Sequence, residues 1–303
     1  MKELQIKREK TMKNRNNIAM AGVMLIISFI SLITASYAWM TIGKNVKVEV
    51  PEFTASAQNN LEISWNDVNN GEWTAWAFSV NISLGDVNDW KLMPASSFGG
   101  ANDTLFYTEE LNDGNSDENT SFKKVVSGDD ITQSKKSGYY VDVPLRIRTT
   151  GTENVKVALD TQKSKIIDID DSEENAQNIS KAVRIAFISP DGKKNSLGND
   201  ININFGENKE FAPFVYSINN EFTGKVITGV TGKDKVSPYY LNKDIQILNI
   251  KGKNEDTENY LDGTEFIARI WLEGEDSNCR AINGGKSFAI SLKFIAIDDN
   301  TNN

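Results

Sequence analysis

The sequence contains no histidine among its 303 residues and only one cysteine, Cys279. Without histidine there is no Ser-His-Asp triad, no Cys-His dyad and no H-E-x-x-H zinc motif. One cysteine supplies neither an intramolecular disulfide nor a zinc cluster, so we expect Cys279 to be a small, partly buried residue in a turn. The composition therefore favours a protein that is not an enzyme and that holds no cofactor or metal ion.

Positive charge is scarce outside the N-terminus. Residues 1–15 carry six basic and two acidic side chains, a balance of +4, whereas the whole chain has a net charge of −9. The remainder therefore carries −13 (−9 minus +4), and an acidic surface of this size repels nucleic acid. The sequence also lacks a G-x-x-x-x-G-K-[ST] or G-x-G-x-x-G loop for phosphates. We expect no nucleic-acid partner.

One apolar segment follows the basic stretch. Residues 18–34 contain no charged side chain, and the small residues Ser36 and Ala38 precede Trp39. A basic start, an apolar core and small residues at these positions are typical of a secretory signal peptide. The pattern predicts that residues 1–38 are a leader, which a signal peptidase cleaves between Ala38 and Trp39.

The alternative is an uncleaved signal anchor, because about 20 apolar residues can span a bilayer. In that case residues 18–39 hold the protein in the membrane permanently rather than during export alone. In both cases the basic N-terminal flank stays in the cytoplasm, and residues 39–303 are secreted or displayed at the cell surface.

The exported part alternates apolar and polar side chains with a period of two, which predicts strands with one buried and one exposed face. The predicted strands cover residues 46–50, 61–65, 76–84, 141–147, 155–159, 183–187, 201–205, 245–247, 266–272 and 288–294. Many short strands and few helices predict an all-β fold, an antiparallel β-sandwich or jelly roll in a single domain.

Two segments depart from this alternation. Asp171 and the residues that follow it predict one short helix that leads into the strand at Val183. Residues 107–137 are rich in Asn, Asp, Ser and Gly. They predict a long polar surface insertion between strands.

Three acidic groups are candidates for chemistry. Residues 113–119 place oxygen ligands at alternate positions, as calcium loops do, but they lack the glycine and the final glutamate that such loops need. Residues 168–174 could hold a cation, although capping the short helix is simpler. The third group consists of Glu273, Glu275 and Asp276. These carboxylates could serve a glycosidase, but neighbours in one turn seldom face each other across a cleft. We interpret them as solvated charges at the end of a strand.

Six tryptophans are the remaining candidates for ligand contacts. Trp65, Trp76 and Trp271 fall within or beside predicted strands and are assigned to the core or its rim. Trp73 and Trp90 lie in polar, turn-like sequence, where exposed rings can stack on sugars. A membrane-anchored, carbohydrate-binding surface protein is therefore an alternative function.

Three stretches resemble the TasA/camelysin family. The leader that ends in ITASYAWMT is similar to the junction that a SipW-type signal peptidase processes in that family. Residues 182–192 (AVRIAFISPDG) and 266–279 (FIARIWLEGEDSNC) resemble two of its strand regions. The resemblance implies a secreted jelly-roll subunit of extracellular biofilm-matrix fibres. Camelysin-like members are classed as metalloproteases, but a chain without histidine offers no zinc ligand set of the usual kind. We therefore expect this chain to share the architecture and the export of that family, but not a protease activity.

Residues 39–50 follow the predicted cleavage site and alternate Val46, Val48 and Val50 with charged side chains. A strand at a free terminus can pair with an exposed sheet edge of another subunit, through backbone hydrogen bonds and side-chain pockets. The chain is then its own partner in a homopolymer, with other matrix or cell-wall components as further contacts. The alternative is that this segment forms the first strand of its own sandwich.

Overall fold

The structure is a computed structural model of the chain. It describes residues 53–58, 60–67, 71–82, 90–97, 105–108, 122–132, 134–169, 178–199, 214–218, 241, 245–253, 263–274, 276, 278–279 and 286–297. The described residues form an all-β fold, and their one helical element is a turn of 3₁₀ helix, η3 (Ile179–Ala182). Within these ranges no helix is long and apolar enough to cross a membrane.

Two six-stranded sheets make up most of the fold. The strands of sheet A are β1 (Phe53–Ala57), β4 (Ser79–Ile82), β11 (Val155–Leu159), β12 (Lys165–Asp168), β15 (Gln246–Ile250) and β17 (Phe288–Ile297). They lie in the order β15-β11-β17-β1-β4, and β12 also pairs with β17. The strands of sheet B are β2 (Leu61–Asp67), β3 (Glu72–Trp73), β10 (Val141–Thr149), β13 (Val183–Ile188), β14 (Phe214–Tyr216) and β16 (Thr264–Leu272). Their order is β14-β13-β16-β10-β2-β3.

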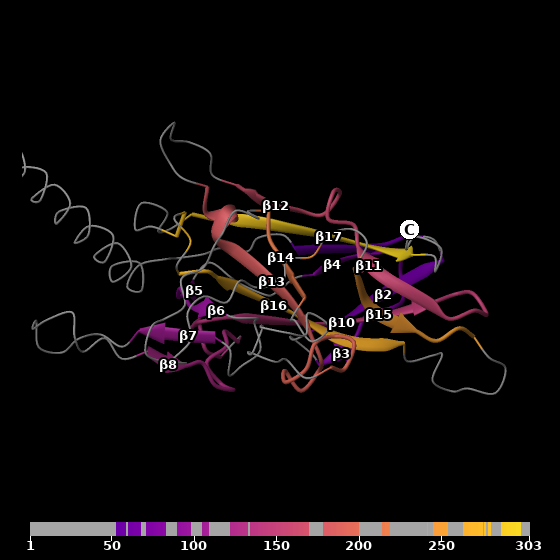
Figure 1. Cartoon of the computed structure of the whole chain (residues 1–303), viewed down its shortest axis with the longest axis horizontal. Helices are drawn as coiled ribbons and strands as arrows, with labels where there is room; N and C mark the ends of the chain where they lie inside the picture. The colour runs from indigo at the N-terminus through magenta and orange to yellow at the C-terminus, as the bar shows by residue number, and fades with distance from the viewer. Residues whose placement is uncertain are drawn as a thin grey trace, which may run out of the picture.

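Two smaller sheets complete the described part. The first pairs β5 (Lys91–Leu92) with β9 (Ser137–Gly138). The second contains β6 (Ser96–Ser97), β7 (Leu105–Thr108) and β8 (Phe122–Lys124). In Figure 1 β7 and β8 lie below β16 and β10, whereas β12 and β17 lie above them.

Sheets A and B pack face to face around a shared core (Figure 1), and we call this pair the sandwich. On β10 every second residue from Val141 to Thr149 is buried, as expected for a strand with one covered face. Phe187 and Phe266 of sheet B contact Phe294 of sheet A edge to face, with ring centroids 5.8 and 5.6 Å apart. The predicted alternation of buried and more exposed residues is confirmed in β10, whereas all six residues of β13 and the last five of β16 are buried, so these strands are covered on both faces.

The prediction of purely antiparallel sheets is wrong for two strand pairs, β1 with β17 and β5 with β9. Phe53 lies opposite Ile290 and Ala57 opposite Phe294, so β1 runs parallel to β17 while it runs antiparallel to β4 on its other side. Alternation shows which side of a strand is buried but not its direction. A parallel pair of distant strands also has no hairpin turn to reveal it in the sequence.

The predicted strand at residues 76–84 is divided in the structure. Ala77 forms a bridge with Ile63 of sheet B, whereas the carbonyl oxygen of Phe78 accepts a hydrogen bond from the backbone N–H of Ala57 in sheet A. The chain crosses from one sheet to the other here. As a result the Phe78 side chain is 63% exposed, and β4 begins only at Ser79.

The outer face of sheet B carries a second, smaller apolar cluster. It consists of Ala95, Val125, Tyr140, Ala186, Ile188, Val215 and Trp271. Ala186 and Trp271 lie on strands of sheet B, whereas Ala95, Val125 and Tyr140 come from the segment that precedes β10. Val125 belongs to the predicted insertion at 107–137 and is fully buried. The chain near Val125 is therefore packed against sheet B.

Candidate functional site

The predicted site residues precede the described part of the chain. Those of the leader junction are Ser36, Ala38 and Trp39, and those of the assembly segment are Val46, Val48 and Val50. The first described residue is Phe53, which comes three positions after Val50. For this predicted site, the structure therefore describes β1, the strand that follows the assembly segment.

That strand, β1, is an interior strand of sheet A. It lies between β17 and β4, and its side chains Phe53 and Ala55 are 1% and 0% exposed. The last residue of β4, Ile82, is opposite Phe53, and β17 begins at Phe288, two positions before the partner of Phe53. In the described part of the chain, the strands on both sides of β1 therefore extend at most two positions upstream of Phe53.

β4 ends the order of sheet A on this side, and in the described part of the chain no strand pairs with its outer edge. Val80 and Ile82 point into the core, whereas Ser79 and Asn81 are exposed. An edge strand of this kind presents backbone N–H and C=O groups to which another strand can add.

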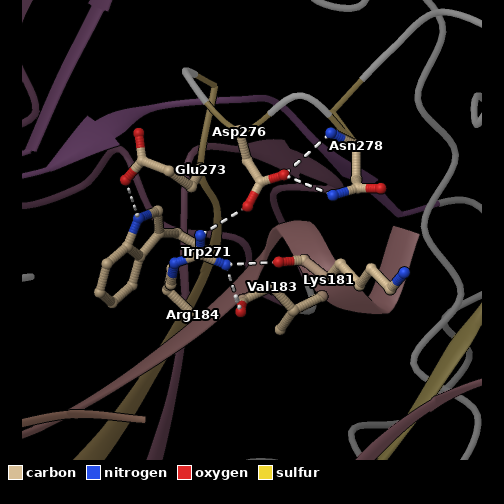
Figure 2. A network of polar contacts seen from close by, with 7 residues as sticks. All are labelled: Lys181, Val183, Arg184, Trp271, Glu273, Asp276 and Asn278. Carbon is tan, nitrogen blue, oxygen red and sulfur yellow. Dashed lines mark hydrogen bonds and ion pairs between the residues drawn. The ribbon is translucent and has the colours of Figure 1, made fainter. Parts of the chain in front are cut away.

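A buried ionic network lies at the end of β16 (Figure 2). The Nη2 atom of Arg184 lies 2.6 Å from Oδ2 of Asp276, and both side chains are 1% exposed. Arg184 also donates to the carbonyl oxygens of Lys181 and Val183, at 2.6 and 3.1 Å. The other carboxylate oxygen of Asp276 accepts two hydrogen bonds from Asn278, one from its backbone N–H and one from its side-chain amide, both 2.8 Å.

Glu273 belongs to the same network and is 1% exposed. Its Oε2 accepts a hydrogen bond of 3.4 Å from the indole nitrogen of Trp271 (Figure 2). Its backbone N–H donates to the carbonyl of Ala182, and its strand neighbour on the other side is Ala95. The network thus joins η3, the end of β16 and the chain that leads into β6.

The interpretation of Glu273 and Asp276 as solvated strand-end charges is wrong. Both are buried because the chain near Ala95 covers this end of β16 and because Arg184 supplies the opposite charge. Arg184 lies 92 positions before Asp276, so no local pattern pairs them. The contacts are those of a structural ion pair. The third carboxylate of the group, Glu275, lies outside the described residues.

Cys279 is buried at 4% exposure, and its backbone N–H closes a turn by donating to the carbonyl of Asp276. Burial, with the nearby carboxylates of Glu273 and Asp276, raises the pKa of the Cys279 thiol above its ordinary value, although Arg184 opposes this. A thiol that stays protonated is a poor nucleophile. The prediction of a buried residue in a turn is confirmed.

The proposed sugar platforms are not open rings. Trp90 is 3% exposed and belongs to the main core, so its assignment to an exposed surface is wrong. The guanidinium of Arg146 lies 4.5 Å from the ring centroids of both Trp73 and Trp76, and that of Arg148 lies 4.4 Å from Trp76. We call these four residues the Trp–Arg ladder. For Trp73, the proposed platform, one cation thus lies over a ring face on which a sugar could otherwise stack.

The assignment of Trp65 and Trp271 to the interior is confirmed, because these side chains are 5% and 0% exposed.

The capping interpretation of the acidic group at 168–174 is confirmed in part. The two carboxylate oxygens of Asp168 accept hydrogen bonds from the backbone N–H and the hydroxyl of Ser180 in η3, at 2.9 and 2.7 Å. The rest of that acidic group, at 170–174, and the acidic loop at 113–119 lie outside the described residues.

Among the residues that the structure describes, no three His, Cys, Asp or Glu side chains are grouped so that they could hold a metal ion. No family model, no curated protein and no solved structure matches this chain.

Proposed function

We propose that this chain is an exported structural protein, the subunit of an extracellular-matrix (biofilm) fibre that assembles by strand exchange of residues 39–50. The observation that carries the proposal is the position of β1. On one side of β1, the last residue of β4 lies opposite Phe53. On the other side, β17 begins two positions before Ile290, the partner of Phe53. A strand that continued β1 upstream past Pro51 would therefore have no neighbour among the described strands. Val46, Val48 and Val50 are then available to the sheet edge of another subunit.

The architecture we propose is a jelly roll. Its support is the order of the strands along the chain, because β1, β2, β4, β10, β11, β13, β15, β16 and β17 lie in sheets A and B in turn, whereas β3, β12 and β14 each follow a strand of their own sheet. A jelly roll consists of two packed sheets, and consecutive strands of the chain are expected to fall in one sheet and then in the other.

Export depends on the apolar helix that we propose for the leader. We propose that residues 1–38 direct the chain out of the cell and that signal peptidase cleaves after Ala38. Changing Ala38 to Arg should then leave the protein in the membrane fraction with an intact N-terminus, whereas changing Asn45 to Arg should not. N-terminal sequencing of the recovered protein decides, and a native chain that retains Met1 outside the cell would contradict cleavage.

Electron microscopy of the purified protein tests the assembly. Deleting residues 39–50 should abolish fibres, and a synthetic peptide of the same residues should cap wild-type ends and shorten them. Val48→Asp places a charge on the apolar side of the alternation and should weaken assembly, whereas Lys47→Gln changes a charge on the opposite side and should not. Normal fibres from the deletion variant would mean that another surface carries the contact.

A further inference from the structure

The outer face of sheet A, which is turned away from sheet B, bears small polar side chains in register. Thr54 of β1 lies between Asn81 of β4 and Ser291 of β17. Ser291 in turn lies opposite Lys165 of β12, and Lys293 lies two positions further along β17. Asn81, Ser291 and Lys165 are exposed, so this surface is open to a partner.

The charge of this face is of one sign. Lys156, Lys165 and Lys293 occupy its outward positions. The six strands of sheet A contain a single carboxylate, that of Asp168, and it is bound to Ser180 of η3. In a chain with a net charge of −9, this face is therefore locally cationic. We call it the lysine face and define it by these three lysines.

The opposite side of the sandwich bears the two strands that an acidic connection joins. Ala95, next to β6, bridges Glu273, and Val125, directly after β8, packs with Trp271 on the outer face of sheet B. The sheet of β6, β7 and β8 therefore lies on the outer side of sheet B (Figure 1). The 13 residues that connect β7 to β8, 109–121, contain no basic residue. Their acidic residues are Glu109, Glu110, Asp113, Asp117 and Glu118.

The connection 109–121 is poorly placed to reach the lysine face of its own chain. Both of its ends, Thr108 and Phe122, belong to strands on the side of sheet B. A connection of this length that must return to its start extends about 20 Å at most. To reach the lysine face it would have to pass around the edges of two sheets that are themselves about 10 Å apart. A contact between copies meets no such limit.

We propose that the lysine face binds the acidic connection 109–121 of a second copy of this chain. Because the two surfaces lie on opposite sides of the sandwich, the contact is head to tail, and each subunit can engage two others in an open row. The inference rests on the proposed function as a fibre subunit, but it uses none of the residues of strand exchange. It would add a lateral or longitudinal contact that salt weakens, since the contact would rest on attraction between opposite charges, which dissolved ions screen.

Two charge-reversal variants of the full chain test the contact. Lys165→Glu with Lys293→Glu makes both surfaces acidic, and Glu110→Lys with Asp117→Lys and Glu118→Lys makes both surfaces basic. Each variant alone should lose self-association at low ionic strength by about 10-fold or more, as measured by sedimentation velocity. An equimolar mixture should regain it, because every lysine face then meets a connection of opposite charge. Lys91→Glu with Lys193→Glu changes the net charge equally outside the lysine face and should have little effect.

The same measurements in a chain that also lacks residues 39–50 separate this inference from strand exchange. The inference predicts that salt-sensitive association and its recovery in the mixture persist without that segment, whether or not fibres form. If folded variants associate like the wild type, or if the mixture does not recover, the lysine face is not the contact. If the mixture recovers but deletion of residues 39–50 leaves fibres unchanged, strand exchange fails while the inference stands.

Discussion

Arg184 and Asp276 are both 1% exposed, and charges so far from water are tolerated only because each touches a partner of opposite sign. The pair is also surrounded by neutral groups that satisfy its remaining hydrogen bonds, among them the carbonyl of Lys181 and the amide of Asn278. The pair therefore holds the loop after β16 against the start of β13. Removing the pair should lower the free energy of unfolding.

Asp276→Asn should lower the free energy of unfolding by about 3–5 kcal/mol, because it leaves the Arg184 charge buried without its counterion. The matched control is Glu62→Gln. Glu62 pairs with Arg148 at 2.7 Å, but the two side chains are 19% and 18% exposed, so its loss should cost about 1 kcal/mol or less. Urea unfolding of both variants measures the difference, and equal losses would contradict the assigned burial.

Two tyrosines predict how stability responds to alkaline pH. Burial raises the pKa of both Tyr140 and Tyr216 from 10.0 to about 12, and for Tyr140 the charge of Arg269 offsets part of the effect. The folded chain therefore keeps these protons where the unfolded chain has lost them. The stabilisation is complete below pH 10 and disappears as the pH rises through 12.

We expect the free energy of unfolding to fall between pH 10 and 12, with a shallower fall in Tyr216→Phe. Tyrosinate absorbance during a pH titration of the folded protein checks the assignment. Ionisation of all tyrosines near pH 10 in the folded state would refute it.

At the scale of elements, strand packing in sheet B depends on close approach at one glycine. Gly263, just before β16, has a φ of +69°, and a Cβ there would lie 2.6 Å from Cη2 of Trp76 and 2.8 Å from the carbonyl oxygen of Ile147. The start of β16 can therefore approach β10 and the Trp–Arg ladder only because this residue has no side chain.

Gly263→Ala should destabilise the protein more than Gly198→Ala does. Both glycines have positive φ, and alanine in that region costs about 1–2 kcal/mol. A Cβ at Gly198 meets no atom within 4 Å, whereas the clash at Gly263 should add about 1–3 kcal/mol. Thermal unfolding compares the two, and a tryptophan fluorescence change only in Gly263→Ala would report the displaced Trp76. Equal shifts of the midpoint would be inconsistent with this packing.

Alternation in the sequence predicts the buried sides of the long strands, since Val143 and Leu145 of β10 and Ile290 and Leu292 of β17 all lie in the core. It does not predict the parallel direction of β1 or the crossing between sheets at Ala77, because both are set by partners far away in the chain. The burial of Trp90 is likewise decided by which chain segment covers it.

The candidate site was predictable to a smaller extent. The leader and assembly segments are predictions from local composition and lie outside the described residues, whereas the buried network needs Arg184, which belongs to another strand. One local signal could have found it. Ile270, Trp271 and Leu272 are consecutive apolar residues, which indicates a strand end covered on both faces, and the charges that follow directly are then also under cover.

At the scale of the whole molecule, β1 divides the N-terminal region into a part the fold needs and a part it does not. A chain without residues 39–50 should unfold cooperatively at a urea midpoint near that of the wild type, because we propose that these residues pair with another subunit and because β1, which begins at Phe53, is kept. A chain without residues 39–58 loses β1 from between β17 and β4 and should not fold. Circular dichroism during urea titration distinguishes the two. A collapse of the shorter deletion would assign residues 39–50 to their own sandwich.

The parallel pairing of β1 with β17 also sets the order of events during export. Phe53 and its partner Ile290 are 237 positions apart (290 minus 53), so β1 has no neighbour on that side until almost the entire polypeptide has been synthesised and translocated. Contacts between residues so far apart in the chain form slowly. In an exported chain that crosses the membrane with its N-terminus first, sheet A would remain incomplete until its last strand, β17, has crossed. If the chain is exported as we propose, the fold couples completion of sheet A to completion of secretion, and a molecule truncated before β17 lacks the strand with which β1 pairs in parallel.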